Sequence, residues 1–212
     1  GAVTHVERDL AGRIVALVSP TGLRTSYSYD ACGRMVDVTD PAGRVMRYSY
    51  TSDFQVATVT YPTGETARYE YDAMGRVVLS HVPGAGVSQY RYDPCGRLVF
   101  SCDLVYGQRH FSYDLAGQLV AATNPAGGVS RYGYDRCGRL VTRTDPGGGL
   151  TTYQYNECGQ MIAATDPLGR VTEYTWDKSG TLAAITRPDG TVVSRRLGPK
   201  GVEEYIDDQL VS

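Results

Sequence analysis

The sequence predicts an all-β fold: an array of antiparallel β-hairpins, one per 21 residues, that curls into a spiral or barrel-like wall. Three observations predict it. Glycine occupies nine of ten positions spaced by 21 residues from Gly12 to Gly201, with Phe54 as the exception. The composition includes 17 Tyr and 25 Gly, which favours strands separated by tight turns. No segment shows the 3.6-residue apolar period of a long helix.

The first element of each unit is an aromatic strand, seen in residues 90–100, which read YRYDPCGRLVF. Alternate residues of a strand share a face, so Tyr90 and Tyr92 lie on the same side of the sheet. Fourteen of the 17 tyrosines fall in two such phases, two residues apart. The first phase contains Tyr27, Tyr48, Tyr69, Tyr90, Phe111, Tyr132, Tyr153 and Tyr174, and the second contains Tyr29, Tyr50, Tyr71, Tyr92, Tyr113, Tyr134, Tyr155 and Trp176.

The second element is an Asp-x-x-Gly turn. The Asp side chain can accept a hydrogen bond from a backbone N–H two residues on, and Gly can adopt positive φ, which predicts a type I turn with a bulge. We therefore assign these turns and the preceding tyrosine a structural role. The residues so assigned are Tyr29, Asp30, Gly33, Tyr71, Asp72, Gly75, Tyr92, Asp93, Gly96, Tyr113, Asp114, Gly117, Tyr134, Asp135, Gly138, Tyr155 and Gly159.

The third element is a return strand that begins with two apolar residues, such as Leu98 and Val99. In a regular strand these two side chains face opposite sides of the sheet. Neither face is then purely polar, so either both faces are partly covered or a curved interior is tightly filled. The fourth element is an Asp-Pro-x-Gly turn, as in residues 145–148, where proline presets φ at the second turn position.

Tight reversals at both ends of each run favour antiparallel hairpins over a parallel β-helix, because parallel strands need long crossovers. About eighteen strands at ~4.8 Å spacing make a ribbon ~85 Å wide, and open twisted sheets rarely exceed ~10 strands without curling. Such a wall has two unpaired edge strands, so we expect it to self-associate or dock through them. A strictly monomeric sedimentation profile at high concentration would argue against this self-association.

The charge, hydropathy and histidine content of the chain argue against several classes of function. The net charge is −2 with acids and bases interspersed, which does not indicate a nucleic-acid partner. No apolar run reaches the ~18 residues of a membrane span, and no signal peptide is visible at the N-terminus. The three histidines, His5, His81 and His110, match no catalytic or zinc motif. We expect no catalytic, cofactor-binding or metal-binding residues and no enzymatic activity.

Cysteines and arginines each allow two interpretations. Four cysteines, Cys32, Cys95, Cys137 and Cys158, precede a turn glycine, and Cys102 stands apart. They are either metal ligands or disulfide partners, or small turn residues of a reducing compartment, which their spacing favours. The arginine after each turn glycine either pairs with the turn Asp or covers a Tyr ring, or else contributes to a Tyr/Arg surface that binds glycans or a denatured polypeptide.

The phrase Tyr-Asp-x-x-Gly-Arg-Leu, repeated every 21 residues and alternating with Asp-Pro-x-Gly, resembles the Rhs/YD-repeat family of bacterial Rhs toxins, Tc toxin shell components and teneurins. Residues 71–77 (YDAMGRV) and 113–119 (YDLAGQL) carry it, and the resemblance covers residues 8–197. Two turns depart from the motif, at residues 51–55 and 198–202. In that family the repeats form a hollow shell of spiralling hairpins that commonly encloses a C-terminal toxin domain.

The resemblance implies a non-catalytic shell segment of an Rhs-type toxin that encloses or scaffolds a cargo domain. The alternative is a YD-repeat module that binds carbohydrate or a cell surface. Expected partners are the rest of the same polypeptide, its toxin domain, and a secretion spike or chaperone. The protein would be made in the cytoplasm and delivered outside the cell. We expect a lead-in over residues 1–7, about nine repeats over 8–201, and an acidic tail over 202–212.

Overall fold

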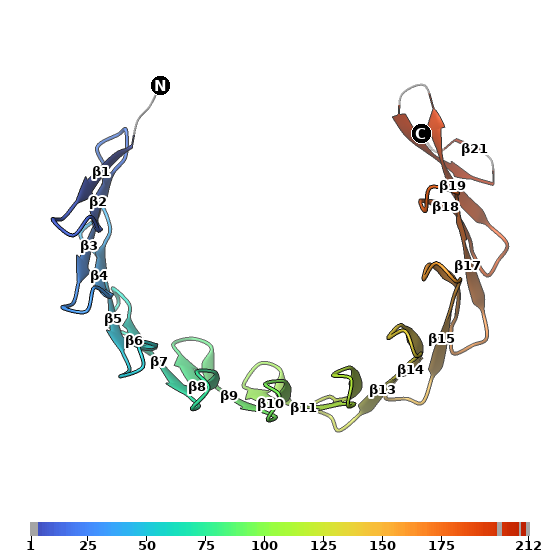
Figure 1. Cartoon of the computed structure of the whole chain (residues 1–212), viewed down its shortest axis with the longest axis horizontal. Coiled ribbons are helices and arrows are strands. Elements are labelled where there is room, and N and C mark those ends of the chain that lie inside the picture. Colours follow the sequence, from blue (N-terminus) through green and yellow to red (C-terminus); the bar gives the residue numbers. More distant parts are fainter. Residues whose placement is uncertain (1–3, 199–200, 208, 211–212) are drawn as a thin grey trace. The chain divides into compact units, whose positions relative to one another are not determined.

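The computed structural model describes residues 4–198, 201–207 and 209–210, which form twenty-one strands and no helix (Figure 1). The first ten strands are β1 His5–Arg8, β2 Ile14–Val18, β3 Arg24–Tyr29, β4 Met35–Thr39, β5 Val45–Tyr50, β6 Val56–Thr60, β7 Thr66–Tyr71, β8 Val77–Val82, β9 Gly86–Tyr92 and β10 Leu98–Asp103. The others are β11 Gly107–Tyr113, β12 Leu119–Thr123, β13 Val129–Tyr134, β14 Leu140–Thr144, β15 Leu150–Tyr155, β16 Met161–Thr165, β17 Val171–Trp176, β18 Leu182–Thr186, β19 Val192–Gly198, β20 Gly201–Ile206 and β21 Gln209–Leu210.

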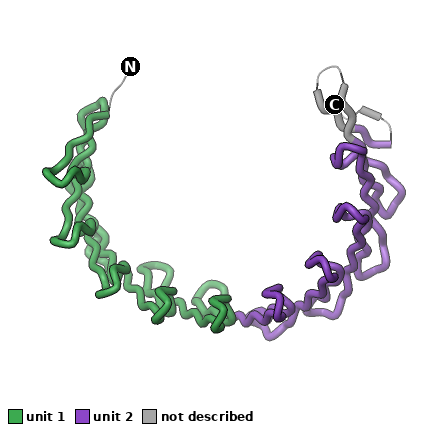
Figure 2. Tube along the Cα trace, viewed as in Figure 1, with its two compact units in different colours: residues 1–108 green, residues 109–212 purple. Residues whose placement is uncertain are grey.

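The chain divides into two units, residues 1–108 and residues 109–212 (Figure 2). In the first unit every strand from β1 to β10 pairs antiparallel with the next one along the chain. The strands from β11 to β21 pair in the same way. Within each unit the hairpins follow one another along a bent strip. The predicted fold class, an all-β array of antiparallel hairpins, is confirmed.

Successive turns lie at opposite ends of the strands, so each unit has one edge of Asp-x-x-Gly turns and one edge of Asp-Pro-x-Gly turns. The two kinds of hairpin differ in register. In the β3–β4 hairpin, Ser28 pairs with Asp37 but Tyr29 pairs with Met35, so Val36 is an extra residue in a β-bulge. The β4–β5 hairpin, closed by an Asp-Pro-x-Gly turn, pairs without a shift.

The bulge corrects one sequence-based expectation. The two apolar residues after Gly-Arg were expected to face opposite sides because a regular strand alternates its side chains. In this structure they lie where two residues oppose one tyrosine, so regular alternation is interrupted there. The same shift recurs at the Asp-x-x-Gly end of the other such hairpins, including β7–β8, β13–β14 and β17–β18.

The strands form a single layer with very little core. Among the residues whose side chains are described, the only buried apolar ones are Ala16, Ala67 and Phe100. The chain exposes 14126 Å². A compact monomer of its mass, 23.0 kDa, exposes about 9,600 Å² by the usual scaling of surface with mass. Most side chains on both faces are therefore half-exposed, and the hairpins are held mainly by backbone pairing and by contacts near the turns.

Candidate functional site at the Asp-x-x-Gly turn edge

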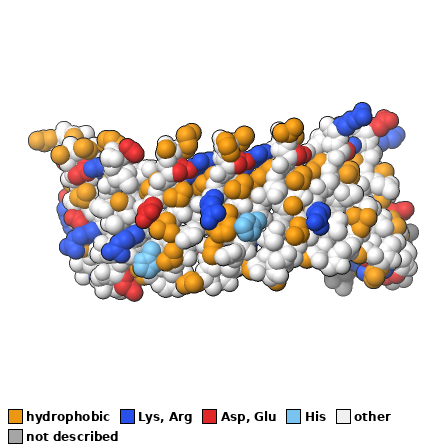
Figure 3. All heavy atoms as spheres, turned by 90° about the horizontal axis from the view of Figure 1, so that it is seen from below, with side chains coloured by type: hydrophobic (Ala, Val, Ile, Leu, Met, Phe, Trp, Pro, Cys, Tyr) orange, Lys and Arg blue, Asp and Glu red, His pale blue; other side chains and the backbone are white. Residues whose placement is uncertain are grey.

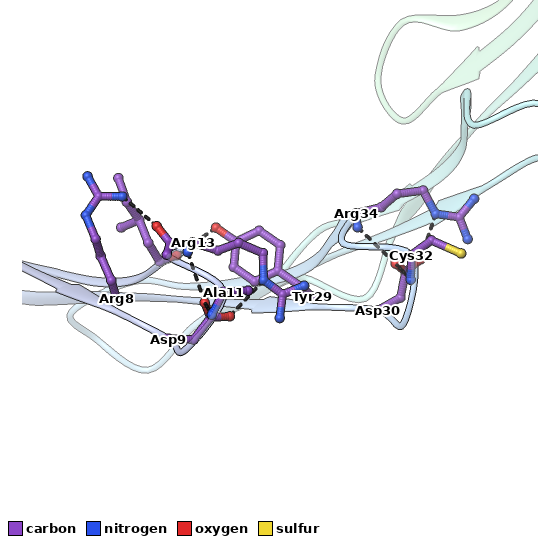
Figure 4. Close-up of polar contacts among 10 residues, drawn as sticks. Arg8, Asp9, Ala11, Arg13, Tyr29, Asp30, Cys32 and Arg34 are labelled. Atoms are coloured by element: carbon purple, nitrogen blue, oxygen red, sulfur yellow. Dashed lines mark hydrogen bonds and ion pairs between the residues drawn. The ribbon is translucent and has the colours of Figure 1, made fainter.

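Each Asp-x-x-Gly turn is organised by its aspartate, as residues 30–34 illustrate (Figure 4). Gly33 donates its N–H to the Asp30 carbonyl at 3.0 Å, and Asp30 donates to the Arg34 carbonyl at 2.8 Å. The Asp30 carboxylate accepts the N–H groups of Cys32 and Arg34 through Oδ1, both at 2.9 Å. Gly33 has φ +82°, which a glycine adopts without the strain of a side chain. The type I turn with a bulge that the sequence predicts is present.

The turn arginine links its own turn to the next repeat. Arg34 donates Nε to Asp30 Oδ2 at 2.7 Å, and its guanidinium lies 4.9 Å from the centre of the Tyr50 ring. It also donates Nη1 to the Thr51 carbonyl at 3.4 Å. The two uses that the sequence offers for this arginine, ion pair or ring contact, thus occur together. The same stacking joins Arg13 to Tyr29 at 4.8 Å, Arg76 to Tyr92 at 4.6 Å and Arg139 to Tyr155 at 4.9 Å.

The second tyrosine of most repeats donates a hydrogen bond to the preceding repeat. Tyr29 donates its hydroxyl to the Ile14 carbonyl at 2.6 Å, fifteen residues earlier and at the start of the preceding return strand. That carbonyl lies beside the bulge, where the regular ladder of backbone bonds is interrupted. The equivalent donors and acceptors are Tyr50 and Met35, Tyr71 and Val56, Tyr92 and Val77, Tyr134 and Leu119, Tyr155 and Leu140, and Trp176 and Met161, the last through the indole N–H.

Three repeats have glutamine in place of the turn arginine, and the link to the next repeat is kept. Gln55 donates its amide to the Gly75 carbonyl at 2.7 Å, twenty residues on. Gln118 and Gln160 do the same to Gly138 at 3.0 Å and to Gly180 at 3.4 Å. A neutral amide therefore replaces the guanidinium as donor. The sequence pattern did not predict the role of these glutamines or of the carbonyls that the tyrosines reach, although the partners lie at constant offsets of 20 and 15 residues.

The turn at residues 51–55, marked as a departure from the motif, keeps the fold of its neighbours. Phe54 takes the glycine position with φ 65° and donates its N–H to the Thr51 carbonyl at 3.2 Å. Its ring is 63% exposed and lies 5.1 Å from the Arg34 guanidinium. The other departure, at residues 198–202, falls partly outside the described residues.

The two tyrosine phases differ in their hydroxyl contacts. Tyr48, of the first phase, donates to Met46 Sδ at 2.9 Å. In the described part of the chain, the other first-phase tyrosine hydroxyls make no hydrogen bond, whereas most of the second phase reach a carbonyl. The unbonded ones belong to Tyr27, Tyr69, Tyr90, Tyr132, Tyr153 and Tyr174. Both phases are half-exposed. Among the described residues, only the second phase donates a side-chain hydrogen bond to the preceding repeat.

In the first strand, β1, an arginine takes the position of the second tyrosine and makes a different contact. Arg8 stands where later repeats have the second tyrosine, and it donates Nη1 to the Gly12 carbonyl of its own turn at 2.7 Å (Figure 4). In later repeats a glutamine of the preceding repeat reaches the equivalent glycine carbonyl, as Gln55 does at Gly75. The β1 edge therefore satisfies within itself a contact that elsewhere crosses between repeats.

The Asp-Pro-x-Gly edge has the same ion pair between arginine and aspartate, but in the described residues the arginine there donates no hydrogen bond to a neighbouring repeat. Arg44 pairs with Asp40 at 2.6 Å, and Arg170 pairs with Asp166 at 2.7 Å. These arginine side chains are 70% and 62% exposed, against 27% for Arg34, and no ring contact holds either of them. The Asp-Pro-x-Gly edge therefore closes each hairpin, whereas the Asp-x-x-Gly edge also joins neighbouring hairpins.

The turn carboxylates have lowered pKa values. In Asp72 the hydrogen bond from the Arg76 side chain is the largest cause, followed by the Arg76 backbone N–H; in Asp93 the backbone N–H of Arg97 is the largest. The full set with a lowered pKa is Asp9, Asp30, Asp40, Asp72, Asp93, Asp135, Asp166, Asp177 and Asp189. Burial raises the pKa of the bonded tyrosines Tyr50, Tyr71 and Tyr134.

These shifts predict how stability depends on pH. A carboxyl whose pKa is lower in the folded chain stabilises the fold above its unfolded pKa, about 3.9, and loses that effect as pH falls through the folded value. We therefore expect the free energy of unfolding to decrease progressively below about pH 4. Urea unfolding at several pH values measures this. The double variant Asp93→Asn, Asp135→Asn should show a shallower decrease, and an unchanged pH dependence would contradict the role of these carboxylates.

The remaining candidate groups are dispersed. All five cysteines are free; the four beside turn glycines are exposed and Cys102 is half-buried. Across the described residues, no three His, Cys, Asp or Glu side chains are grouped so that they could hold a metal ion. The same part of the chain contains no helix long and apolar enough to cross a membrane.

The distinctive feature of this chain is a 21-residue hairpin repeat with tyrosine and Asp-x-x-Gly at fixed positions. Residues 4–191 match the family model of the teneurin YD-shell. The chain belongs to the teneurin YD-shell family. The predicted relationship to YD-repeat shells is thus confirmed, and membership of this family supports a structural shell role. No curated protein sequence matches the chain.

Solved structures show the same fold as this YD-shell chain. The crystal structure of TcdB2-TccC3 is 18% identical with a TM-score of 0.72, and that of TcdB2-TccC3-TEV is 17% identical with a TM-score of 0.71. Each match covers 95% of this chain and 12% of the other. A Tc holotoxin pore from Photorhabdus luminescens is 13% identical with a TM-score of 0.54, over 96% of this chain and 14% of that one. The chain thus spans about an eighth of the length of these structures.

Proposed function

We propose that this YD-shell chain is a non-catalytic wall segment of an Rhs-type toxin, which encloses or scaffolds a cargo domain until delivery. Its partners are the remaining repeats of the same polypeptide, the enclosed toxin domain, and a secretion spike or chaperone. The protein is made in the cytoplasm and delivered outside the cell. The family match and the likeness to Tc toxin structures support the wall; the cargo and the delivery route are the proposed part.

The single-layer construction carries this proposal. The repeats are joined along one edge by hydrogen bonds and ring contacts, and the described side chains include only three buried apolar residues. Such a sheet leaves much more surface exposed than a compact monomer of equal mass, about 9,600 Å² against the 14126 Å² of this chain. A sheet of this kind suits a wall that borders other material on its faces.

Protease protection tests the proposal in a polypeptide that carries this chain together with its remaining repeats and C-terminal domain. We expect the C-terminal domain to resist a protease that cleaves it quickly when it is isolated. The triple variant Tyr50→Phe, Tyr71→Phe, Tyr92→Phe removes three links between repeats and should speed cleavage of the enclosed domain. Equal cleavage rates for the enclosed and the isolated domain would contradict enclosure.

The alternative function, binding of carbohydrate or a cell surface, has one observation in its favour. The half-exposed first-phase tyrosines, such as Tyr69 and Tyr90, have hydroxyls that make no hydrogen bond in the described part of the chain. Aromatic rings with unbonded hydroxyls can contact sugars. A glycan array with the wild-type chain and with Tyr69→Ala, Tyr90→Ala distinguishes the two. Specific binding that this variant loses would favour the alternative over a purely structural wall.

A further inference from the structure

Several turn tips of the Asp-x-x-Gly edge carry exposed apolar side chains, and two of them lie on neighbouring hairpins of the first unit. Met74 is 78% exposed at the tip of the β7–β8 hairpin, and Phe54 is 63% exposed at the tip of β5–β6. Figure 3 shows hydrophobic side chains in separate clusters along a long edge, and exposed apolar residues occur at turns of both edges, with Leu104 and Leu168 on the Asp-Pro-x-Gly edge. Large exposed apolar side chains on neighbouring hairpins form a candidate surface for contact with another protein.

The Asp-Pro-x-Gly edge of the same hairpins is hollowed. A hollow of about 480 Å³ lies among the successive turns at residues 40–44, 61–65 and 82–86. Its lining is largely apolar, with Tyr61, Pro62 and Pro83, and Arg44 and Glu65 add charged groups. This hollow lies at the opposite end of the β5–β6 and β7–β8 hairpins from the tips that carry Phe54 and Met74.

An equivalent hollow lies six repeats later, in the second unit, and it is charged. Its volume is about 690 Å³, and its lining includes Arg170, Glu173, Arg187 and Asp189. It lies at the Asp-Pro-x-Gly end of the β17–β18 hairpin, between the turns at residues 166–170 and 187–191. The opposite tip of that hairpin carries Lys178 in place of an apolar residue.

The chemistry of tip and hollow agrees on two consecutive hairpins of the first unit, β5–β6 and β7–β8. In the first unit apolar tips lie at one end and an apolar hollow at the other. In the second unit the tip with Lys178 lies opposite a hollow whose lining has two carboxylates, Glu173 and Asp189, and two guanidinium groups, Arg170 and Arg187. The tips follow the 21-residue period, and the two hollows lie six periods apart, so an object with the same period could fill both hollows. A second copy of this chain, shifted along the strand direction, presents such tips in register.

We propose that copies of this chain stack in register, with the Asp-x-x-Gly tips of one copy seated in the hollows of the Asp-Pro-x-Gly edge of the next. This inference rests on the proposed role as a wall and names how wall segments join. Met74 and Phe54 enter the hollow lined by Tyr61, Pro62 and Pro83, where their apolar surface leaves water. The contact is heterologous, because each copy uses two different edges, so further copies can add to the stack.

This contact differs from the strand-edge pairing that the sequence predicts. Strand pairing would use the open side of an edge strand such as β1, where Arg8 bonds within its own turn. Stacking uses the tips of Asp-x-x-Gly turns and the hollows between Asp-Pro-x-Gly turns. The two modes bring different residues together and can be separated by cross-linking.

Disulfide trapping in the full chain tests the stacking. All five native cysteines are replaced by serine, and two single-cysteine chains are made, Met74→Cys at a tip and Thr63→Cys in the hollow. In the stack these residues approach within the ~7 Å between Cα atoms that a disulfide allows. Under oxidised glutathione we expect a disulfide-linked dimer when the two chains are mixed and none in either chain alone. Far-ultraviolet circular dichroism verifies that each chain keeps its β structure.

Three outcomes would overturn the inference. The first is the absence of a dimer in the mixture. The second is a dimer in the Met74→Cys chain alone, which would indicate contact between tips. The third is an equal yield when Ser179→Cys, at a tip of the second unit, replaces Met74→Cys as partner of Thr63→Cys.

Sedimentation of the wild-type chain is an independent readout. We expect concentration-dependent association that Met74→Asp abolishes and Met74→Leu keeps, because aspartate would bring an unpaired charge into an apolar hollow. A wild-type chain that stays monomeric at high concentration would overturn the stacking. Neither experiment uses a cargo domain, so failure of stacking leaves the protease-protection result unaffected, and failure of protection leaves the stacking result unaffected.

Discussion

Replacing Tyr50, Tyr71 and Tyr92 together by phenylalanine should lower the free energy of unfolding by about 3 kcal/mol, since each half-buried hydrogen bond contributes ~0.5–1.5 kcal/mol. Each hydroxyl donates to a carbonyl at the start of the preceding return strand, at 2.6, 2.8 and 3.1 Å. Removing the donor takes one hydrogen bond from a carbonyl that lies beside a bulge, where the strand register shifts. Urea unfolding followed by circular dichroism measures the change.

The first tyrosine phase supplies a matched control. Tyr27, Tyr69 and Tyr90 lie two residues before bonded tyrosines, and their hydroxyls make no hydrogen bond in the described structure. Replacing these three tyrosines together by phenylalanine should alter the free energy of unfolding by less than about 0.5 kcal/mol per site. This is the usual range for a surface substitution that removes no contact. Equal losses in the two triple variants would show that the second-phase hydroxyls do not join the repeats.

Two adjacent glycines of one turn should respond in opposite directions to the same change. Gly148 has φ +88°, so Gly148→Ala places a Cβ in the left-handed region and should destabilise the chain by ~1–2 kcal/mol, although no atom lies within 4 Å of the added carbon. Gly147 has no positive φ, and its turn position holds alanine at Ala42 and Ala126. Gly147→Ala should therefore stabilise by ~0.4–1 kcal/mol, by restricting the unfolded chain.

Thermal or urea unfolding of the two alanine variants measures this difference, and each variant is the control for the other. Both changes add one methyl group to the exposed turn at residues 145–149. They differ in backbone conformation and in the contact of the added Cβ, which meets Asp145 Oδ1 at 3.3 Å at position 147 and no atom within 4 Å at position 148. If Gly148→Ala were as stable as wild type, the assignment of a glycine-dependent turn at this edge would be wrong.

The fold could be predicted from the sequence because its determinants are local and periodic. Tyrosine two residues apart, Asp-x-x-Gly and Asp-Pro-x-Gly each specify a strand or a turn within a few residues, and repetition of these signals makes the array unambiguous. The turn bonds of Asp30 and the positive φ of Gly33 follow from the same local chemistry.

What joins one repeat to the next could not be predicted in the same way. The register shift beside each Asp-x-x-Gly turn depends on how two strands meet, and the sequence pattern alone suggested regular alternation. The Tyr29 hydroxyl reaches Ile14 because this bulge leaves a carbonyl available, fifteen residues away. The role of Arg34 depends on the same geometry: pairing with Asp30 is local, whereas contact with Tyr50 requires the neighbouring hairpin to be in place.

The central claim is that contacts at the Asp-x-x-Gly edge join successive hairpins into one wall, and a double-mutant cycle between Arg76 and Tyr92 tests it most directly. These residues lie in consecutive repeats, with the guanidinium 4.6 Å from the ring centre. The cycle uses Arg76→Leu, Tyr92→Leu and the double variant, with free energies from urea unfolding. The pair Arg76 and Tyr134, from repeats that are not adjacent, is the control and should be additive within ~0.3–0.5 kcal/mol. We expect a favourable coupling of about 0.5–1 kcal/mol between Arg76 and Tyr92. Additivity of this pair, equal to that of the control, would contradict it.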